Sequence, residues 1–354
     1  MRSLGAAKAD LEAYQRRTEE ARTRLAELWE LVRATHASHQ EHTASALKAN
    51  ERTIAAGVRR VVPVENRGWN DPDWRCWQPC ADTAEIERTA SIIRAGHLHD
   101  IDAGTGLATI VALELVGRER PVVILSRTPQ QQQVARALLQ SLVVRAAALL
   151  PHHARFYLLD PAGQGAAFPM ARHLGEALVN TTNQPEALEA LRAEIRRINH
   201  EYLDAAVPAL HLVPAPDREN ERYQLLFAAD YPAFYDPRSV ALVQNIAGAG
   251  SRAGVYAFIH HHLDPNLSHD ALRARISDPE VLDLQQLEQP EVIGEHEARE
   301  QRFPPFRVQI AWDGEPDAAI QHEVLTRITD ARPVQRGLQW ADLAQPEQDG
   351  WWQG

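Results

Sequence analysis

The sequence predicts an α/β protein with a mostly parallel sheet flanked by helices. Short apolar runs alternate with amphipathic stretches between residues 121 and 262, and strands that alternate with helices pair in parallel through right-handed crossovers. Near the N-terminus an apolar residue recurs every seven positions, which is typical of a long coiled-coil helix. An alternating stretch followed by a helical one near the C-terminus predicts a small α+β extension.

Composition limits the classes of protein to consider. The chain has 354 residues, a net charge of −11 and 44% apolar residues. The acidic balance argues against a surface that coats DNA without specificity. No apolar run approaches the roughly 20 residues that span a membrane, so no membrane span is predicted. Two cysteines, Cys76 and Cys80, are too few for a disulfide framework and indicate a reducing cytoplasm.

Residues 1–55 are predicted to form a coiled-coil helix. Their repeat holds for about four heptads and fades after Val32. We expect this helix to self-associate or to dock on a partner helix; the alternative is packing on the rest of the chain. His36, His39 and His42 are interpreted as a solvated face rather than a metal site, because no carboxylate or cysteine completes a ligand set. The two seams are Leu4, Leu11, Thr18, Leu25, Val32 and His39, and Ala7, Tyr14, Ala21, Leu28, Thr35 and His42.

Residues 56–85 are predicted to be an ordered linker rich in proline and tryptophan. Trp69, Trp74 and Trp77 lie within nine residues, and we expect them to anchor the N-terminal helix to the body. A stacking platform for nucleic acid is the weaker interpretation, because few basic residues lie nearby. A zinc site is a minor alternative, because no second cysteine pair exists; its ligands would be Cys76, Cys80, His97 and His99.

Residues 86–263 form the predicted α/β core. Ligands of parallel sheets bind at the carboxyl ends of the strands, where Asp160, Asp230 and the run His260–His262 fall. The structural alternatives are that Asp160 begins a turn after a strand, that Asp230 caps or ends a strand, and that the histidine run is a strand end half in solvent. Alternation along a strand would place His260 and His262 on one face. The predicted strands are 92–102 (a strand or a hairpin), 122–125, 155–160, 223–229 and 254–261, and the predicted helices are 129–150, 185–206 and 239–251.

Residues 264–354 form the predicted acidic extension, with 18 acidic and 8 basic residues. Residues 303–312 alternate like an antiparallel strand, residues 324–331 have a helical pattern, and residues 337–340 are a further candidate strand. Trp351 and Trp352 close to the end of the chain predict a surface that a partner covers.

Four stretches resemble the FtsK/SpoIIIE group of P-loop DNA translocases, within the FtsK–HerA superfamily. The resemblance covers roughly residues 90–354 and rests on the order of VVILSRTPQQQQVARALLQSL, FYLLDPAGQG, YQLLFAADYPAF and NIAGAGSRAGVYAFIHH. It implies a RecA-like core. More specifically, the chain resembles the N-terminal half of proteins with a leading coiled coil and two tandem cores, the first of which is commonly degenerate. The segment near Trp351 resembles the junction before the second core.

The resemblance places a phosphate-binding loop between a strand and a helix, but the residues there lack its chemistry. The lysine position falls on Gln132 and the Ser/Thr position on Gln133, within one residue. A glutamine amide carries no charge to stabilise a transferred phosphoryl group, and a turn without glycine does not readily form a phosphate nest. The vestigial loop positions are Thr128, Gln130, Gln131, Gln132 and Gln133.

The second half of the implied nucleotide site is also incomplete. Asp230 matches the Walker B aspartate, which would hold magnesium through water, whereas Tyr231 stands where a glutamate would orient the attacking water. Lysine occurs only at Lys8 and Lys48, so the core contains none. We therefore expect no catalytic residue, no metal ligand set and no bound cofactor, and a vestigial ATP–magnesium site is the alternative left open.

These patterns together predict a non-hydrolysing module of an FtsK/SpoIIIE-type DNA-translocation system. The implied partners are an active FtsK-like ATPase half or a homologous protein, double-stranded DNA, and a second copy bound through the coiled coil. Arg252 is a candidate trans-acting arginine finger, with a surface salt bridge as the alternative. A coiled-coil scaffold without a nucleotide or DNA role is the second hypothesis. The third, an active ATPase with an unusual site, conflicts with the lysine-free core.

Overall fold

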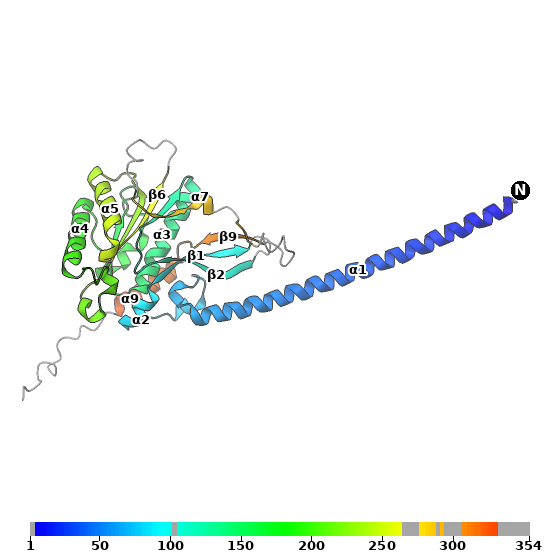
Figure 1. Ribbon diagram of the computed structural model, residues 1–354, viewed down its shortest axis with the longest axis horizontal. Coiled ribbons are helices and arrows are strands. Elements are labelled where there is room, and N and C mark those ends of the chain that lie inside the picture. The colour runs from blue at the N-terminus through cyan, green and yellow to red at the C-terminus, as the bar shows by residue number, and fades with distance from the viewer. Residues whose placement is uncertain (1–3, 101–104, 264–275, 288–290, 294–305, 332–354) are drawn as a thin grey trace, which may run out of the picture. The chain divides into compact units, whose positions relative to one another are not determined.

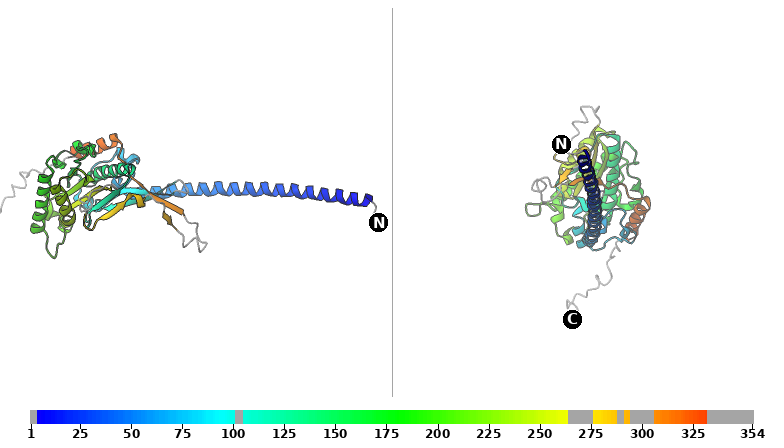
Figure 2. Two further views of the ribbon diagram at one scale, coloured as in Figure 1. Left: turned by 90° about the horizontal axis from the view of Figure 1, so that it is seen from above. Right: turned by 90° about the vertical axis from the view of Figure 1, so that its right-hand side faces the viewer.

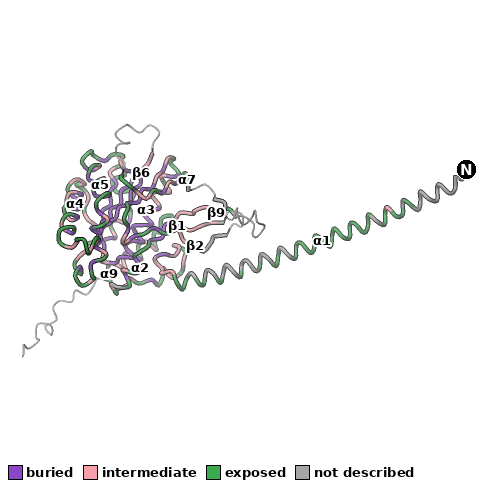
Figure 3. Tube along the Cα trace, viewed as in Figure 1, coloured by how far each residue is buried: buried purple, intermediate pink, exposed green. Residues whose placement is uncertain are grey.

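The computed structural model describes residues 4–100, 105–263, 276–287, 291–293 and 306–331. The chain divides into two compact units, residues 1–61 and residues 62–354. The first unit is a single helix, α1 (Leu4–Val61), of 58 residues, which Figures 1 and 2 show as one uninterrupted rod. Its described side chains are almost all exposed (Figure 3). They include the predicted seam residues Tyr14, Leu25, Leu28 and Val32.

The second unit contains a five-stranded parallel sheet with strand order β4-β5-β6-β3-β7. Counted along the chain from β3, this order is 2-3-4-1-5, the order of a RecA-like core. The predicted α/β fold class is therefore confirmed. The strands are β3 (Val122–Ser126), β4 (Ala154–Leu159), β5 (Tyr223–Tyr231), β6 (Val255–His262) and β7 (Glu280–Asp283).

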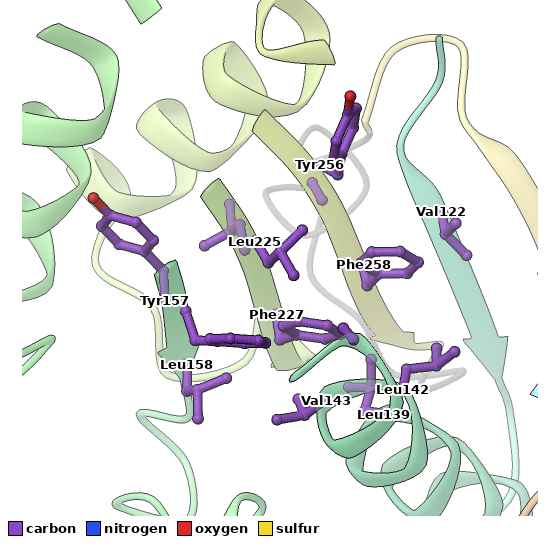
Figure 4. Packing of buried hydrophobic residues seen from close by; sticks show 14 of the residues in the cluster. Val122, Leu139, Leu142, Val143, Tyr157, Leu158, Leu225, Phe227, Tyr256 and Phe258 are labelled. Atoms are coloured by element: carbon purple, nitrogen blue, oxygen red, sulfur yellow. The ribbon is translucent and has the colours of Figure 1, made fainter. Parts of the chain in front are cut away.

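Helix α3 (Pro129–Leu149) packs on one face of this sheet. In Figure 4 its side chains Leu139, Leu142 and Val143 lie against Phe227 and Phe258. Every residue of the helix from 138 to 149 is buried, because α3 also contacts a second sheet and helix α9. A helix that is covered on all sides is a core helix. No helix in the described part of the chain combines the length and apolarity needed to cross a membrane.

The second sheet is antiparallel, with strand order β2-β1-β9-β8. Strand β1 lies so close to β9 that a side-chain Cβ at Gly96 would stand 2.4 Å from the carbonyl oxygen of Ala311, so this pairing requires glycine. The predicted strand or hairpin near residue 92 is the β1–β2 hairpin. These strands are β1 (Ile92–Asp100), β2 (Thr105–Glu114), β8 (Glu291–Ile293) and β9 (Phe306–Trp312).

Segments after residue 263 contribute to both sheets, because β7 joins the parallel one and β8 and β9 the antiparallel one. Helices α4 and α5 pack against each other, and α5 contacts β6. The predicted strand at residues 337–340, Trp351 and Trp352 lie outside the described residues. The remaining helices are α2 (Thr83–Thr89), α4 (Gln184–Glu201), α5 (Pro237–Ala249), α7 (Leu284–Leu287) and α9 (Ala318–Asp330). The 3₁₀ turns are η1 (Val64–Asn66), η2 (Pro72–Arg75), η3 (Pro169–His173), η4 (Gly175–Ala177), η5 (Leu210–Leu212), η6 (Ala215–Arg218) and η7 (Ser251–Ala253).

The tryptophan-rich segment packs into the second unit. Trp74 and Trp77 are 1% and 5% exposed, so the alternative of a nucleic-acid stacking platform is wrong for these two rings. The guanidinium of Arg145 on α3 lies 4.1 Å from the ring centroid of Trp69. Its Nη2 donates to Asp313 Oδ2 at 2.6 Å. The buried Arg145 guanidinium thus links α3 to the tryptophan-rich segment and to the residue that follows β9.

Candidate functional site

Three neighbouring strands of the parallel sheet end in polar residues. Ser126 ends β3, Asp230 lies next to the end of β5, and His260 lies near the end of β6. Asp230 has a φ of 51°, in a stretch where the β5–β6 register shifts. Aspartate tolerates this left-handed conformation better than most residues. Asp230 and the histidines thus lie at the carboxyl ends of their strands, where the sequence places them.

The Asp230 carboxylate is bound by two side chains of α3. Gln132 Nε2 donates to Oδ1 at 2.7 Å. Arg136 donates to Oδ2 through Nε at 2.9 Å and Nη2 at 2.6 Å. The residue is 3% exposed. Both carboxylate oxygens therefore already have donors from the protein, and the cation beside the carboxylate is the Arg136 guanidinium.

Burial and these contacts oppose each other in setting the charge of the carboxyl group. Burial by itself would raise the pKa of Asp230, but the hydrogen bonds from Arg136 and Gln132 outweigh it and lower the pKa. Asp230 is consequently ionised at neutral pH. Charge-assisted hydrogen bonds of this kind are among the strongest hydrogen bonds in proteins, so the Asp230–Arg136 pair stabilises the fold.

A hydrogen-bonded chain continues from Asp230 into the sheet. The Asp230 backbone N–H donates to His260 Nδ1 at 3.4 Å, and Ser126 Oγ lies 2.8 Å from His260 Nε2 and 2.9 Å from His262 Nδ1. Burial lowers the pKa of His260 to about 4, so its imidazole is neutral at pH 7. The tautomer with the proton on Nε2 donates to Ser126, whereas the tautomer with the proton on Nδ1 donates to Asp230 Oδ1 at 3.3 Å and accepts from Ser126.

The series serine, histidine and aspartate has the composition of a hydrolase triad but not its access to solvent. In a triad the histidine Nδ1–H donates to the aspartate, and His260 Nδ1 lies 3.3 Å from Asp230 Oδ1 as well as 3.4 Å from the Asp230 backbone nitrogen. Ser126 and His260 are both fully buried, so no substrate reaches the serine hydroxyl. This hydrogen-bonded series links β3, β5 and β6 and is not a nucleophilic site.

The amino end of α3 is closed by its own side chains. Thr128 Oγ1 accepts from Gln131 N at 3.2 Å, and Gln131 Oε1 accepts from Arg127 N at 2.9 Å. Pro129 has no N–H to offer. This arrangement resembles a capping box, and it uses backbone donors that a phosphate nest would direct at its ligand.

The predicted loop residues have different surroundings and do not face one common position. Gln130 and Gln133 are exposed, Gln131 belongs to the helix cap, and Gln132 binds Asp230. Tyr231 is fully buried. Its ring makes an edge contact with His261.

Two further candidates have structural partners. Asp160 accepts hydrogen bonds from the backbone N–H groups of Gly163, Gly165 and Ala167 at 2.8 to 3.1 Å, so it organises the turn after β4. Arg252 is exposed at the amino end of β6, where its Nε donates to the Pro208 carbonyl at 2.8 Å. Its trans-acting role stays a prediction.

Metal ligation finds no support in the described part of the chain, where no group of three or more His, Cys, Asp or Glu side chains is placed to hold an ion. The Cys76 thiol contacts the Asp73 carbonyl and the Cys80 thiol contacts Asp82 and Glu85.

The sequence does not predict Arg136 and Ser126 as site residues, and the predicted exposure of His260 and His261 is wrong. His260 and His261 are 0% and 6% exposed, so the expected half-solvated strand end is wrong for both. Arg136 follows Gln132 by four residues on one helix, a spacing that places both side chains on one face and offers the only sequence signal. Ser126 and His260 meet through register, which no local pattern predicts.

Comparison with known proteins gives only distant structural likeness. No protein-family model and no curated protein matches the chain. EssC (ATPases 2 and 3) from Geobacillus thermodenitrificans is 14% identical with a TM-score of 0.42, over 72% of this chain and 50% of EssC. The cytoplasmic domain of the Thermomonospora curvata type VII secretion ATPase EccC is 17% identical with a TM-score of 0.44, over 76% of this chain and 34% of EccC.

The conjugation coupling protein TcpA of pCW3, in its monomer form with ATPγS, is 11% identical with a TM-score of 0.42, over 73% of this chain and 74% of TcpA. The chain thus spans half of the EssC structure and about a third of the EccC structure. None of these values identifies a function for the chain.

Proposed function

We propose that the chain is a non-hydrolysing RecA-like module of an FtsK/SpoIIIE-type DNA-translocation system. In this role it supports assembly or DNA handling by an active ATPase half in the cytoplasm. The observation that carries the proposal is the occupation of Asp230 by Arg136 and Gln132. The fold of a nucleotide-binding core is retained while its cation position is filled by the protein itself.

Hydrolysis of a nucleoside triphosphate needs positive charge on the β- and γ-phosphates and an oriented water molecule. The chain offers Gln132 where a lysine is needed and a buried tyrosine, Tyr231, where a carboxylate is needed. Arg136 does not replace the lysine, because its guanidinium is committed to Asp230. The amino end of α3 is capped by Thr128. Three requirements are therefore unmet together: a phosphate-binding cation, a water-orienting carboxylate and free backbone donors at the start of the helix.

The nature of the partner comes from the sequence resemblance. The FtsK-like stretches imply an active FtsK-type ATPase, or a homologous protein, and double-stranded DNA as ligands of the assembled system. With a net charge of −11, the chain by itself has no general electrostatic attraction for DNA. DNA contact is therefore proposed for the assembly rather than for the isolated chain.

Phosphate release by the purified full chain, measured with ATP, Mg²⁺ and double-stranded DNA, tests the proposal. We expect no release above the protein-free blank, and a change in the DNA-stimulated rate of an FtsK-type ATPase when the chain is added. Turnover that requires Mg²⁺ and disappears in the Asp230→Ala variant would overturn the proposal. The Gln133→Ala variant is the matched control, because this exposed side chain lies next to Gln132 without contacting Asp230.

A coiled-coil interaction or scaffold protein is the second candidate, and helix α1 favours it. Its described seam residues Leu25, Leu28 and Val32 are between 56% and 60% exposed, and an apolar stripe on a long helix is the surface that a partner helix covers. Both candidates include self-association through α1. Binding to DNA in the presence of the ATPase, with an affinity that falls steeply with salt, would separate the first candidate from the second.

A further inference from the structure

Helix α1 carries a cluster of three histidines beyond its apolar repeat. His36, His39 and His42 are the only histidines of α1 and lie within about two helical turns of each other. The helix passes through them without a break, and the side chains of His36 and His42 are exposed. Neither candidate function gives these residues a role.

Two of the three histidines continue the apolar seams of the helix. The seven-residue repeat places His39 in the seam of Val32 and His42 in the seam of Leu28, whereas His36 lies beside the seams. In a coiled coil the seam side chains point toward the partner helix. A second copy would therefore bring His39 and His42 into the interface and leave His36 at its margin.

An exposed apolar stripe directly precedes the histidines, and it is the surface that a second helix would cover. The inference therefore rests on the self-association through α1 that belongs to the proposed function. His39 follows the last residue of the stripe by about 10 Å along the helix axis. The stripe consists of five side chains that are between 56% and 64% exposed, namely Leu25, Leu28, Trp29, Leu31 and Val32.

The seam histidines favour a parallel pair of helices in register. In that alignment like residues meet, so His39 faces His39 and His42 faces His42 of the other copy. An antiparallel pair would instead match Leu25 with Leu28 of the other copy. His42 would then lie against Leu11, where its ring nitrogens lose water without gaining a hydrogen-bond partner. Polar residues at seam positions set the register of coiled coils in this way.

The two histidine layers of a parallel pair are close enough to share one ion. Residues three apart on a helix share a face and are separated by about 4.5 Å along the axis. Tetrahedral zinc, with Zn–N bonds of about 2.0 Å, needs neighbouring nitrogens about 3.3 Å apart. Four imidazoles from two copies can therefore converge on a point between the layers. One copy alone is insufficient, since among the residues that the structure describes no three candidate ligands are grouped.

We propose that His39 and His42 of two parallel copies of α1 together bind one Zn²⁺ ion. Each copy supplies two neutral imidazole nitrogens, and the four complete the tetrahedral ligand set that zinc prefers. The ion holds the two helices in register. Because zinc binds the pair and not the single helix, zinc binding and self-association stabilise each other.

Zinc titration of the full chain, without an affinity tag and after removal of metal with EDTA, tests the proposal. We expect the dissociation constant of the self-associated chain, measured by sedimentation equilibrium, to fall at least about tenfold at saturating Zn²⁺. Mg²⁺ prefers oxygen ligands and should have no effect. Co²⁺ in place of Zn²⁺ should give the intense visible absorption of tetrahedral coordination.

Three alanine variants locate the site, and alanine at these helix positions favours the helix. His39→Ala and His42→Ala should each abolish most of the effect of Zn²⁺ on association and the visible absorption of bound Co²⁺. His36→Ala is the matched control on the same helix and should behave as the wild type. Isothermal titration calorimetry should show that the double variant His39→Ala/His42→Ala binds one Zn²⁺ fewer per two chains than the wild type.

Several outcomes would overturn the zinc site. They are an equal loss of the zinc effect in His36→Ala, association of the double variant that Zn²⁺ still promotes, and a difference of one Zn²⁺ per single chain. The measurements in EDTA separate this proposal from the self-association on which it rests. Association in EDTA that Zn²⁺ leaves unchanged would overturn the zinc site and retain the coiled coil. A chain that is monomeric with and without Zn²⁺ would overturn both.

Discussion

The Asp230 carboxylate and the Arg136 guanidinium are the pair that defines the chemistry of this edge of the sheet. Replacing Arg136 with alanine leaves a buried carboxylate without its two strongest donors. We expect the free energy of unfolding to fall by about 1–3 kcal/mol, less than for a fully buried pair, because Arg136 is partly exposed. Urea denaturation measures the change. Gln133→Ala on the same helix should stay close to the wild type, and an equal loss in both variants would contradict this role.

The buried His260 makes stability depend on pH. Its pKa in the folded chain is about 4, below the ordinary 6.5. The unfolded chain therefore binds the proton first as pH falls, and the folded state loses up to about 3 kcal/mol between pH 6.5 and pH 4. Above pH 6.5 this group has no effect.

Denaturation midpoints at a series of pH values, compared between the wild type and His260→Asn, check this expectation. The variant should lose stability more gradually as pH falls. A residual slope remains, because burial also lowers the pKa of His97, His153 and His211. Identical slopes in both proteins would mean that His260 does not carry the effect.

At the residue scale, the position of the candidate site follows from the sequence, but its contacts do not. The motif order places Asp230 after a strand and Gln132 at a helix start. Their direct hydrogen bond, and the competing guanidinium of Arg136, depend on how α3 packs on β5. No local pattern contains that information, because the two segments lie 98 residues apart.

Helix α1 carries its own prediction at the scale of an element. In the proposed coiled coil, Leu28→Glu places a charge in the apolar seam, and we expect the dissociation constant of the self-associated chain to rise more than about tenfold. Ala26→Glu on the outward face is the matched control. Sedimentation equilibrium of the full chain measures both. Unchanged association in Leu28→Glu, or equal weakening in both variants, would remove α1 as the assembly element.

Helix α3 shows why a buried charge is retained in a core. Arg145 is fully buried, contacts the rings of Trp69 and Trp74, and donates to Asp313. Arg145→Ala leaves the Asp313 carboxylate with Arg94 alone, so we expect a loss of about 3–5 kcal/mol in the free energy of unfolding. Arg155→Ala, an exposed position of β4, is the control in the same urea titration; a loss in it as large as in Arg145→Ala would contradict the assignment.

Elements with strong local patterns were predicted well. The strand at 223–229 and the helix at 129–150 correspond to β5 and α3 within a few residues, because an apolar run and an amphipathic stretch mark them. The pairing of β1 with β9 could not be predicted, since it joins residues more than 200 positions apart. Such pairing depends on tertiary packing rather than on local preference.

At the scale of the whole second unit, elements from the two ends of its described chain pair and pack with each other. Strand β9 pairs with β1, β7 completes the parallel sheet beside β3, and α9 packs on α3. Loss of any one of these contacts exposes a strand edge or the buried side of a core helix. We therefore expect the described parts of residues 62–354 to unfold as one cooperative unit.

Hydrogen exchange followed by mass spectrometry tests this expectation. Peptides from β1, β5, β7 and β9 should exchange through global unfolding with one common free energy, because β9 pairs with β1, β7 pairs with β3, and α3 contacts strands of both sheets. Peptides from α1 should exchange at a lower free energy, since that helix is a separate unit whose described side chains are mostly exposed. Exchange of β7 and β9 at a distinctly lower free energy than β1 and β5 would show instead that the segments after residue 263 form an independent extension.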